Sequence, residues 1–448
     1  MAHQRFRFRN LEELDEACAG LGVSLPLASH LAPLARSVRI GRGEAPNSMA
    51  VHPMEGCDGT VDGKPDDLTR RRYRRFAAGG CGLLWFEATA VVPEGRANLR
   101  QLLMAPTTEP AIRDMLRSSL ATARESMGED WRPYTVLQLT HSGRYSRPNG
   151  RPAPLLVQHD PLLDGPVGAS PKAPVVSDAY LDSLIDAYVG AARLAQQSGF
   201  DAVDVKACHR YLISELLAAH TREGHYGGVL ENRTRLLLDI VRAIHREVPS
   251  LDIAVRLNVY DGHPYPWGWG VDRDDAQVPD LSEPLWLVGA LRDAGVALLN
   301  VTAGNPYYTP HINRPFDDNV EGGYVPDEHP LVGVGRLVGL ARRVKERFPD
   351  LVVVGTGYSW LRQYAANAMA GVLERGWADM VGMGRGAFAY PNWARDVLER
   401  GALDRRRVCI ACSRCTQIMR DSGRTGCVIR DRDVYGPIYE AGRTRSCD

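Results

Sequence analysis

The sequence has no excess of charge of either sign, since Lys and Arg together number 54 and so do Asp and Glu. A chain without net charge has no overall field to attract nucleic acid or an anionic membrane, so we expect neither as a partner. The chain also lacks an apolar run of roughly 18 residues that could span a membrane. Its first residues, Met1 to Arg9, lack the apolar core of a signal peptide. We therefore expect a cytoplasmic protein that acts on a small molecule.

Cysteine is sparse over most of the chain and concentrated near one end. Five of the nine cysteines are scattered: Cys18, Cys57, Cys81, Cys208 and Cys447. Disulfides are rare in a reducing compartment, so these are expected to be small buried residues, with Cys57 and Cys208 near strand ends. The others follow the spacing C-x2-C-x2-C-x11-C: Cys409, Cys412, Cys415 and Cys427. Four such thiolates indicate a metal centre, and zinc or an iron–sulfur cluster would satisfy them.

Short apolar runs alternate with longer amphipathic patterns along most of the chain. The strand-like runs are Met49 to Met54, Gly82 to Glu87, Tyr134 to Leu139, Ala202 to Lys206, Ile253 to Asn258, Ala297 to Thr302, Leu351 to Gly355 and Asp379 to Gly384. Brief runs rich in Val, Leu and Ile are typical of strands covered on both faces. Helix signals fall between them, such as Ser177 before and Gly199 after one long pattern. The alternation predicts an α/β fold, a (β/α)8 TIM barrel.

We divide the chain into three parts: an N-terminal extension over residues 1–40, the barrel over 41–402 and the cysteine-rich segment over 403–448. The longest connections from a strand to a helix are residues 140–176, 207–230 and 303–330. All three lie on the face where barrel enzymes place their sites. A roofed pocket is expected there.

The run from Gly199 to Glu215 ends a predicted strand and brings Lys206, His209 and Tyr211 together. Ammonium, imidazole and phenol groups at the C-terminal end of a barrel strand are suited to polarise a carbonyl and to deliver a proton. The alternative is that the imidazole and the phenol only satisfy hydrogen bonds beneath a loop.

Two glycine pairs end the seventh and eighth predicted strands, Gly355-Thr-Gly357 and Gly384-Arg385-Gly386. Glycine lets backbone N–H groups approach a phosphate closely, and Arg385 can clamp its oxygens. Because barrels bind phosphate after these two strands, the pairs predict a ligand that carries phosphate.

Gln138 and Arg144 near the third strand and Arg256 on the fifth add an amide and two cations at the barrel mouth. An anionic or electron-rich cofactor ring would give these groups partners. The alternative makes Arg256 half of a structural ion pair.

Motifs in order over roughly residues 40–430 make a specific resemblance: Pro53-Met54, Glu87-Ala-Thr89, Gln138-x-x-His-x-Gly-Arg144, His209-x-Tyr211, Tyr226-Gly-Gly, Glu231-Asn-Arg233 and the two glycine pairs. The sequence resembles the old yellow enzyme family. Within it, the chain is similar to the branch of 2,4-dienoyl-CoA reductase and trimethylamine dehydrogenase, whose barrels are followed by an iron–sulfur cluster. This implies bound FMN and a [4Fe–4S] cluster.

The resemblance also implies roles for single residues. Tyr211 matches the proton donor, and His209 matches one of two residues that grip the carbonyl oxygen of the substrate. Arg222 and Tyr226 match loop positions near the active site. The implied cofactor contacts are Pro53, Met54 and Ala88 along the flavin, Gln138 at its pyrimidine edge, Arg256 near N1, and Gly355, Gly357, Gly384 and Arg385 at the phosphate. The implied cluster ligands are Cys409, Cys412, Cys415 and Cys427.

The chain departs from the family pattern at three positions. Lys206 stands where many relatives have a first histidine, and Glu55 stands where Thr or Cys often faces the flavin. Gly224 replaces an acid in a loop. The lysine could hold a carboxylate or enolate oxygen, or it could pair with Glu55 and take no part.

The resemblance therefore predicts an ene-reductase that reduces the activated C=C bond of an α,β-unsaturated carbonyl or carboxylate compound. No G-x-G-x-x-G follows the cysteines, so an external donor such as a ferredoxin or a flavoprotein reductase is expected. NAD(P)H remains a possible direct or indirect source of electrons, and a homo-oligomer remains open.

Three other functions stay open from the sequence. One is an amine dehydrogenase or demethylase of the trimethylamine dehydrogenase type, with an aromatic cage drawn from Trp267, Trp269, Tyr307 and Tyr308. Another is a redox-neutral barrel enzyme with structural zinc. The last is an electron-transfer subunit without catalysis of its own.

Overall fold

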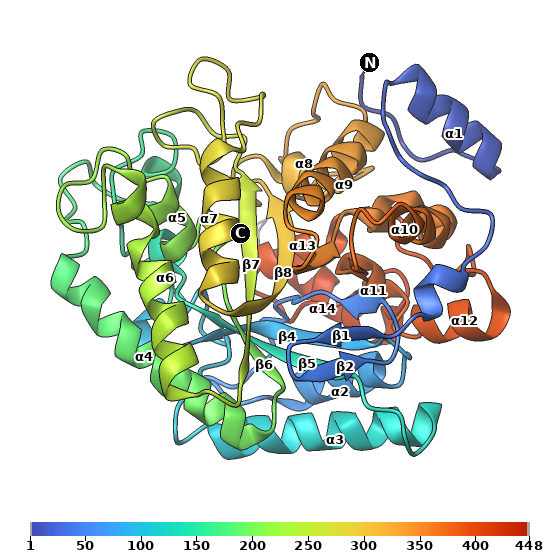
Figure 1. The fold of residues 1–448 in the computed structure, drawn as a ribbon, viewed down its shortest axis with the longest axis horizontal. Helices are drawn as coiled ribbons and strands as arrows, with labels where there is room; N and C mark the ends of the chain where they lie inside the picture. The colour runs from blue at the N-terminus through green and yellow to red at the C-terminus, as the bar shows by residue number, and fades with distance from the viewer. Residues whose placement is uncertain (1, 446–448) are drawn as a thin grey trace.

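The computed structural model describes residues 2–445. In this part of the chain eight parallel strands close into a barrel in the order β10-β3-β4-β5-β6-β7-β8-β9, with helices outside it (Figure 1). The barrel strands are β3 (Met49–Val51), β4 (Leu83–Ala90), β5 (Tyr134–Thr140), β6 (Ala202–Val205), β7 (Asp252–Tyr260), β8 (Val296–Ala303), β9 (Val352–Gly355) and β10 (Met380–Met383). The predicted TIM barrel is confirmed.

The helices of the described residues are α1 (Leu11–Gly20), α2 (Asp67–Ala77), α3 (Glu109–Met127), α4 (Asp178–Ser198), α5 (Leu212–Leu217), α6 (Leu230–Glu247), α7 (Ser282–Asp293), α8 (Pro310–Asn313), α9 (Pro330–Arg347), α10 (Ala365–Glu374), α11 (Arg385–Ala389), α12 (Trp393–Arg400), α13 (Arg414–Arg420) and α14 (Arg432–Arg445). Short 3-10 turns are η1 (Ala32–Ala35), η2 (Pro93–Gly95), η3 (Gly143–Tyr145), η4 (Gly165–Val167) and η5 (Tyr358–Tyr364). The end signals of α4 act as predicted, because the side chain of Ser177 accepts from Tyr180 N and Gly199 ends the helix with a φ of 97°.

An antiparallel hairpin, β1 (Val38–Ile40) and β2 (Gly43–Ala45), closes the N-terminal end of the barrel. Ile40 and Ala45 pack into the same buried cluster as interior barrel side chains. At the turn, Arg42 N donates to Asp252 Oδ2 at 2.9 Å. Gly41 has a φ of 50°, and a Cβ there would lie 2.3 Å from the same carboxylate oxygen, so the turn requires glycine. The predicted boundary at residue 40 falls at this turn.

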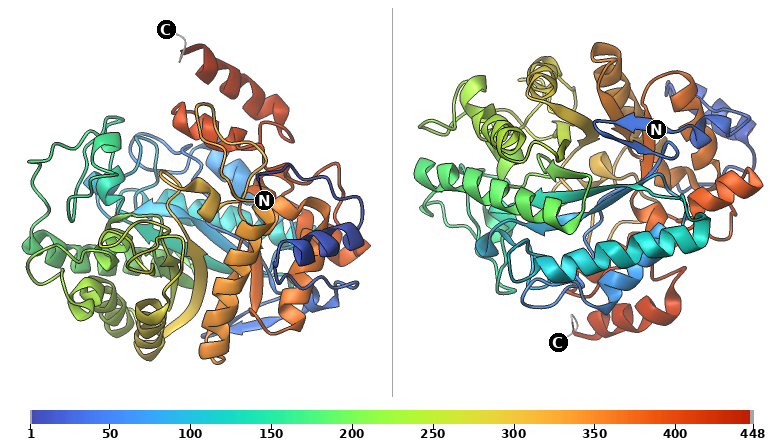
Figure 2. Two further views of the ribbon diagram at one scale, coloured as in Figure 1. Left: turned by 90° about the horizontal axis from the view of Figure 1, so that it is seen from above. Right: turned by 60° about the horizontal axis from the view of Figure 1, so that its bottom comes forward.

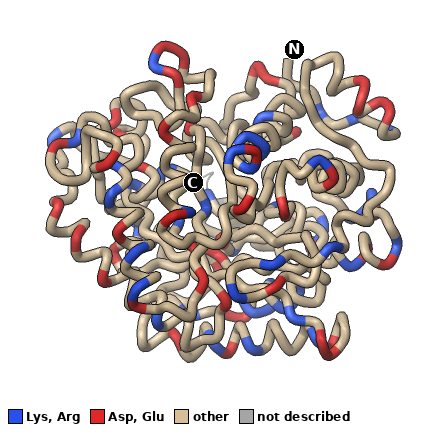
Figure 3. Tube along the Cα trace, in the orientation of Figure 1, with Lys and Arg blue, Asp and Glu red and all other residues tan. Residues whose placement is uncertain are grey.

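The cysteine-rich segment packs outside the barrel, and α14 projects from the body of the molecule (Figure 2). Ile418, Val428 and Tyr435 form its own small buried cluster. Basic and acidic residues are interspersed along the trace (Figure 3), as expected from the balanced composition. Within residues 2–445 no helix is long and apolar enough to cross a membrane. Cys447 lies outside the described residues.

Candidate active site

A cavity of about 1280 Å³, its open mouth included, lies at the C-terminal ends of the barrel strands. Its wall contains the three predicted catalytic residues, Lys206, His209 and Tyr211. It also contains most of the predicted cofactor residues: Pro53, Met54, Ala88, Gln138, Arg256, Gly357, Gly384 and Arg385. Gly355, the last residue of β9, lies behind this wall, and Thr356 lines the cavity beside it. Residues from all sides of the barrel therefore meet at one site.

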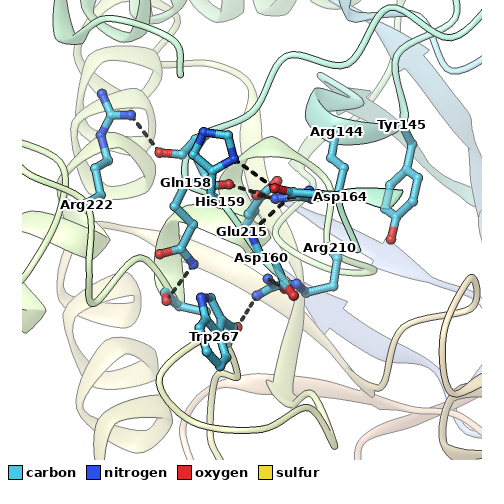
Figure 4. A network of polar contacts seen from close by, with 12 residues as sticks. Arg144, Tyr145, Gln158, His159, Asp160, Asp164, Arg210, Glu215, Arg222 and Trp267 are labelled. Carbon is cyan, nitrogen blue, oxygen red and sulfur yellow. Dashed lines mark hydrogen bonds and ion pairs between the residues drawn. The ribbon is translucent and has the colours of Figure 1, made fainter. Parts of the chain in front are cut away.

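The loop after β6 carries the predicted catalytic residues, and its backbone is strained at two positions. His209 and Arg210 have φ values of 65° and 59°, a region that side-chain-bearing residues rarely adopt. Arg210 is fully buried, and its guanidinium contacts Asp160 Oδ2 at 3.2 Å and Asp261 Oδ2 at 3.4 Å. It also donates to Trp267 O at 2.7 Å (Figure 4). These buried contacts fix the turn that carries His209 and Tyr211.

Tyr211 is 3% exposed and its hydroxyl lies 3.1 Å from that of Tyr307. The Tyr307 ring stacks on Tyr145 with 3.9 Å between centroids, and it is 42% exposed at the cavity mouth. Burial raises the pKa of Tyr211 well above its ordinary value. The phenol is therefore protonated at neutral pH, and the second hydroxyl links it toward the mouth.

His209 is a neutral side chain in this site. Its Nε2 lies 3.1 Å from Nδ2 of Asn313, and the same amide nitrogen donates to Ala303 O at 3.0 Å. Because the amide nitrogen is the donor, Nε2 accepts and the ring proton is on Nδ1. Burial, with the charges of Arg256 and Lys206, lowers the pKa of His209 well below its ordinary value. The imidazole can donate a hydrogen bond but brings no charge.

Lys206 is 5% exposed, and its Nζ lies 3.6 Å from the centroid of the Tyr211 ring. Burial lowers the pKa of the ammonium and raises the pKa of the half-buried Glu55. Asn98 donates to Glu55 Oε1. In the described residues no ion pair within 4.0 Å joins Lys206 to Glu55. The pairing with Glu55 that would keep Lys206 from binding a ligand is therefore not formed.

Gln138 and Arg256 form a second wall of the cavity. Gln138 Nε2 donates to Asp204 Oδ2 at 2.6 Å, which leaves the amide oxygen for another partner. Burial raises the pKa of Asp204 to about 6. The Arg256 guanidinium donates to Pro53 O at 3.3 Å, and its buried Nε has no hydrogen-bond partner in the described residues. Arg256 is not half of an ion pair there, so it is free to meet a ligand.

Two arginines meet at the far end of the cavity. Arg385 donates to Pro315 O at 2.6 Å while its other terminal nitrogen, Nη1, is buried without a partner in the described residues. Arg314 donates to Ser413 Oγ at 3.3 Å, and its buried Nη2 likewise has no partner among those residues. Gly357 has a φ of 106°, and a Cβ there would lie 2.8 Å from Leu337 Cδ1. The motifs did not reveal Arg314, because it follows α8 without a local pattern.

The cysteine loop reaches the same cavity, since Cys415 lines it together with Thr416 and Met419. Cys409 Sγ accepts from Ala411 N at 3.3 Å, and Cys427 Sγ accepts from Arg430 N at 3.4 Å. Burial, with neighbouring thiols, raises the pKa of Cys409 to about 11 and that of Cys427 to about 12. Over residues 2–445 no three His, Cys, Asp or Glu side chains are arranged to hold a single metal ion.

Arg144 is a structural residue rather than a cation at the mouth. It is fully buried and forms ion pairs with Asp164 and Glu215 (Figure 4). These partners are 20 and 71 residues away in the chain, so the motif around Gln138 gave no sign of them.

Two loop residues implied by the resemblance also lie outside the cavity. Arg222 pairs with Asp178 at 2.7 Å, and Tyr226 donates to Asp182. Both tie the loop before α6 to the first turns of α4. Their role in this chain is to hold the loop.

Of the four aromatic residues considered for a cage, Tyr307 alone lines the cavity among the described residues. Trp269 is fully buried and donates to Asn258 O at 3.0 Å. Trp267 contributes its carbonyl oxygen to Arg210. Tyr308 lies against His263 with 5.0 Å between centroids.

Comparisons with known proteins agree with this arrangement. Residues 34–265 match the family described as NADH:flavin oxidoreductase / NADH oxidase. An NADPH dehydrogenase of Geobacillus sp. (strain WCH70) is 32% identical over 222 residues, which are 49% of this chain and 61% of that protein. An NADH oxidase of Thermoanaerobacter brockii is 26% identical over 390 residues, 86% of this chain and 53% of that protein. This chain thus spans about half to three fifths of the length of these relatives.

Solved structures share the fold. A 2-naphthoyl-CoA reductase complex aligns with a TM-score of 0.71 at 19% identity, over 92% of this chain and 58% of that one. A 6-hydroxypseudooxynicotine amine oxidase from Pseudomonas geniculata N1 aligns at 0.68 and 22%, over 92% and 56%. The family match covers half of the chain and includes Pro53, Gln138, Tyr211 and Arg256. The protein belongs to the NADH:flavin oxidoreductase / NADH oxidase family.

Proposed function

We propose that the protein is an FMN-dependent reductase of activated C=C bonds that carries a [4Fe–4S] cluster beside its active site. The observation that supports this most is one cavity in which a protonated phenol, a neutral imidazole and a buried ammonium face unpaired arginines. This combination supplies a proton, stabilises an oxyanion and leaves cationic groups for an anionic cofactor.

The cavity suits FMN, because its unsatisfied polar atoms match the groups that this cofactor presents. The free amide oxygen of Gln138 can accept from the N–H at the pyrimidine edge, and Arg256 can face the ring where negative charge develops on reduction. The unpartnered nitrogens of Arg385 and Arg314 can take phosphate oxygens. Pro53, Met54 and Ala88 provide apolar wall.

When bound and reduced, FMN supplies the hydride that an activated alkene accepts at its β-carbon. The side chains of the protein then donate the proton and stabilise the negative charge that develops on the substrate. Tyr211 Oη donates a proton to the α-carbon, so that the alkene gains one hydride and one proton in total. His209, through Nδ1–H, and Lys206 stabilise the negative charge that develops on the activating oxygen, and such stabilisation is typically worth roughly 3–4 kcal/mol in a dry site. The hydroxyl of Tyr307, 3.1 Å away, can return a proton to Tyr211.

The placement of the cysteine loop supports a redox cluster. Backbone N–H groups that donate to the sulfurs of an iron–sulfur cluster help to set its potential. Cys409 and Cys427 have such donors. Cys415 lies in the wall of the cavity itself, so electrons from this loop would reach the ring directly.

The electron donor is the second part of the proposal. A ferredoxin or a flavoprotein reductase would deliver electrons through the cysteine loop, whereas the names of the relatives support NADPH or NADH as the source. Rapid anaerobic mixing separates these routes. Full reduction of the flavin by NAD(P)H alone, at the rate of turnover, would show that no partner protein is needed.

An amine substrate is supported less well by this cavity. The rings of Tyr145, Tyr211 and Tyr307 cluster together, as a cation site would require. However, Lys206 already lies over the Tyr211 ring, and its charge repels a substrate ammonium. We therefore prefer the alkene.

The first test is anaerobic purification followed by a visible spectrum and by iron and sulfide analysis. We expect flavin and about four irons per chain. A colourless, well-folded protein would contradict the proposal and would favour the redox-neutral enzyme with zinc.

Replacing the proton donor tests the reaction. Tyr211→Phe should slow alkene reduction roughly 10²-fold to 10⁴-fold, because a positioned general acid contributes this much. The rate of flavin reduction should stay normal. Tyr145→Phe is the matched control, since its hydroxyl accepts from Asn305 and Tyr145 does not line the cavity. Normal turnover of Tyr211→Phe with enones and enoates would remove Tyr211 from this role.

A further inference from the structure

The wall of the active-site cavity is strongly cationic. Its charged residues are Lys206, Arg256, Arg314, Arg385, Arg420 and Glu55. Five of the six are basic, in a chain whose overall charge is balanced. Under the proposed function FMN accounts for three of them, Arg256 at the ring and Arg314 and Arg385 at the phosphate. Lys206 and Arg420 are left to face the substrate.

Lys206 is built to hold an anion. Its side chain is 95% buried, given its exposed fraction of 5%, and it forms no hydrogen bond or ion pair with the described residues. The Tyr211 ring lies against the ammonium group, but the ring is not a hydrogen-bond acceptor for its three N–H groups. The nitrogen itself is not sealed from the cavity, so its three donors are available to a ligand that enters.

The position of this lysine indicates which part of the substrate it meets. It lies with His209 and Tyr211 at the point where the activating group of the alkene must be gripped for protonation at the neighbouring carbon. His209 is neutral and can offer one hydrogen bond, which suits a ketone or an aldehyde. A conjugated carboxylate already carries a negative charge and gains a second one when hydride adds, so it needs a cation at this place.

We propose that the substrate is an α,β-unsaturated acid bound as its carboxylate, and that Lys206 is the residue that selects this anion. The inference rests on the proposed function and names its substrate class. Hydride forms the new C–H bond at the β-carbon, the π electrons move onto the carboxylate beside Lys206, and the proton of Tyr211 forms the C–H bond at the α-carbon. The reductant is the reduced flavin.

Arg420, at the end of α13, supports the same class. Its side chain is exposed toward the mouth of the cavity and has no hydrogen bond or ion pair with the described residues. The exposed ring of Tyr307 lies in the same wall. A cation at the entrance raises the local concentration of an anion and repels an amine.

The test measures binding apart from turnover. Oxidised holoenzyme cannot reduce an alkene, so calorimetric titration reports affinity alone. Three acid and amide pairs of equal shape serve as probes: cinnamate and cinnamamide, crotonate and crotonamide, benzoate and benzamide. We expect at least one acid to bind about tenfold more tightly than its amide, as a charge-assisted contact should provide.

Variants assign this preference to a residue. Lys206→Met keeps an unbranched side chain of nearly the same length and removes the charge, so acid and amide should then bind almost equally. Lys172→Met removes the same charge from an exposed loop and should keep the preference. Arg420→Gln, at an exposed position, should slow association of the acid and reduce its dependence on salt. If Lys206→Met does not fold, Arg420→Gln still tests whether the cation at the entrance attracts the acid.

The outcomes separate this inference from the proposed function. Equal affinity for acid and amide in all three pairs, absence of binding by every acid, or a preference that survives Lys206→Met would overturn the inference, even if the enzyme reduces neutral enones. Selective binding of the acid that depends on Lys206, without reduction by the reduced enzyme, would support the anion site and would contradict the ene-reductase proposal.

Discussion

Arg210→Met tests whether the buried ion pairs behind the active-site loop hold the catalytic residues in place. Arg210 contacts two buried carboxylates, Asp160 and Asp261. Removing one partner of a buried pair costs about 3–5 kcal/mol, because the remaining charge stays buried. The entropy of unfolding is roughly 2.1 cal/mol/K per residue, so about 0.9 kcal/mol/K for 448 residues. The expected fall in Tm is therefore about 3–5 °C.

The same substitution should reduce turnover. The backbone at His209 and at residue 210 is in the left-handed region, which costs of order 1–3 kcal/mol for each residue and persists only where the surroundings enforce it. Without the guanidinium this strain can relax and displace His209 and Tyr211. A displacement of about 1 Å can cost roughly 10²-fold in rate.

Calorimetry would give Tm, and single-turnover kinetics would give the rate of alkene reduction by the reduced enzyme. Arg144→Met is the matched control: it removes another fully buried arginine with two ion pairs, but its loop has no strained catalytic residues. We expect a similar loss of Tm and a smaller loss of rate. A normal rate in Arg210→Met, despite a lower Tm, would refute the argument that this network positions the loop.

Two further outcomes follow from single residues. Lys206→Met should be more stable than the natural protein at pH 7. Burial lowers the pKa of Lys206 below its ordinary value of 10.5, which means that burying the charged ammonium costs free energy of folding. Methionine does not carry this cost. The advantage should shrink as the pH rises from the folded pKa toward 10.5, and thermal unfolding at pH 7 and pH 10 checks this; a gap that widens with pH would contradict the sign. Cys427→Ser should lower the iron and sulfide content while the FMN content stays near normal, because the flavin residues are on other loops; unchanged iron would remove Cys427 from the ligand set.

The sequence was sufficient to predict the barrel, because each strand is a brief apolar run between helix signals and alternation of this kind has few solutions. All eight predicted strands occur, although β4 and β7 continue to Ala90 and Tyr260. The hairpin of β1 and β2 was not predicted. Its strands have three residues each, too few for a periodic pattern.

The sequence placed Lys206, His209 and Tyr211 at the end of one strand and Arg256 on the next, and all four line the same cavity. The sequence could not show which charged side chains have ion-pair partners within the protein. In the sequence both Arg144 and Arg256 are cations close to a predicted barrel strand. In the structure Arg144 is held by two carboxylates that are distant in the chain, whereas Arg256 has no ion-pair partner in the described residues. Arg314 and Tyr307 reach the cavity from the long connection after β8, whose path no local pattern determines.

The hairpin at the N-terminal end of the barrel also restricts access to the cavity. Because β1 and β2 close one end of the barrel, the proposed alkene and a soluble reductant would both approach the flavin from the cavity side, where the exposed ring of Tyr307 lines the wall. The alkene and the reductant could then not occupy the cavity at the same time, and the product would have to leave before the next nicotinamide could enter. Under the proposed function, electrons delivered through a cluster at Cys415 would not need this opening, so the flavin could be reduced again while the substrate is still bound.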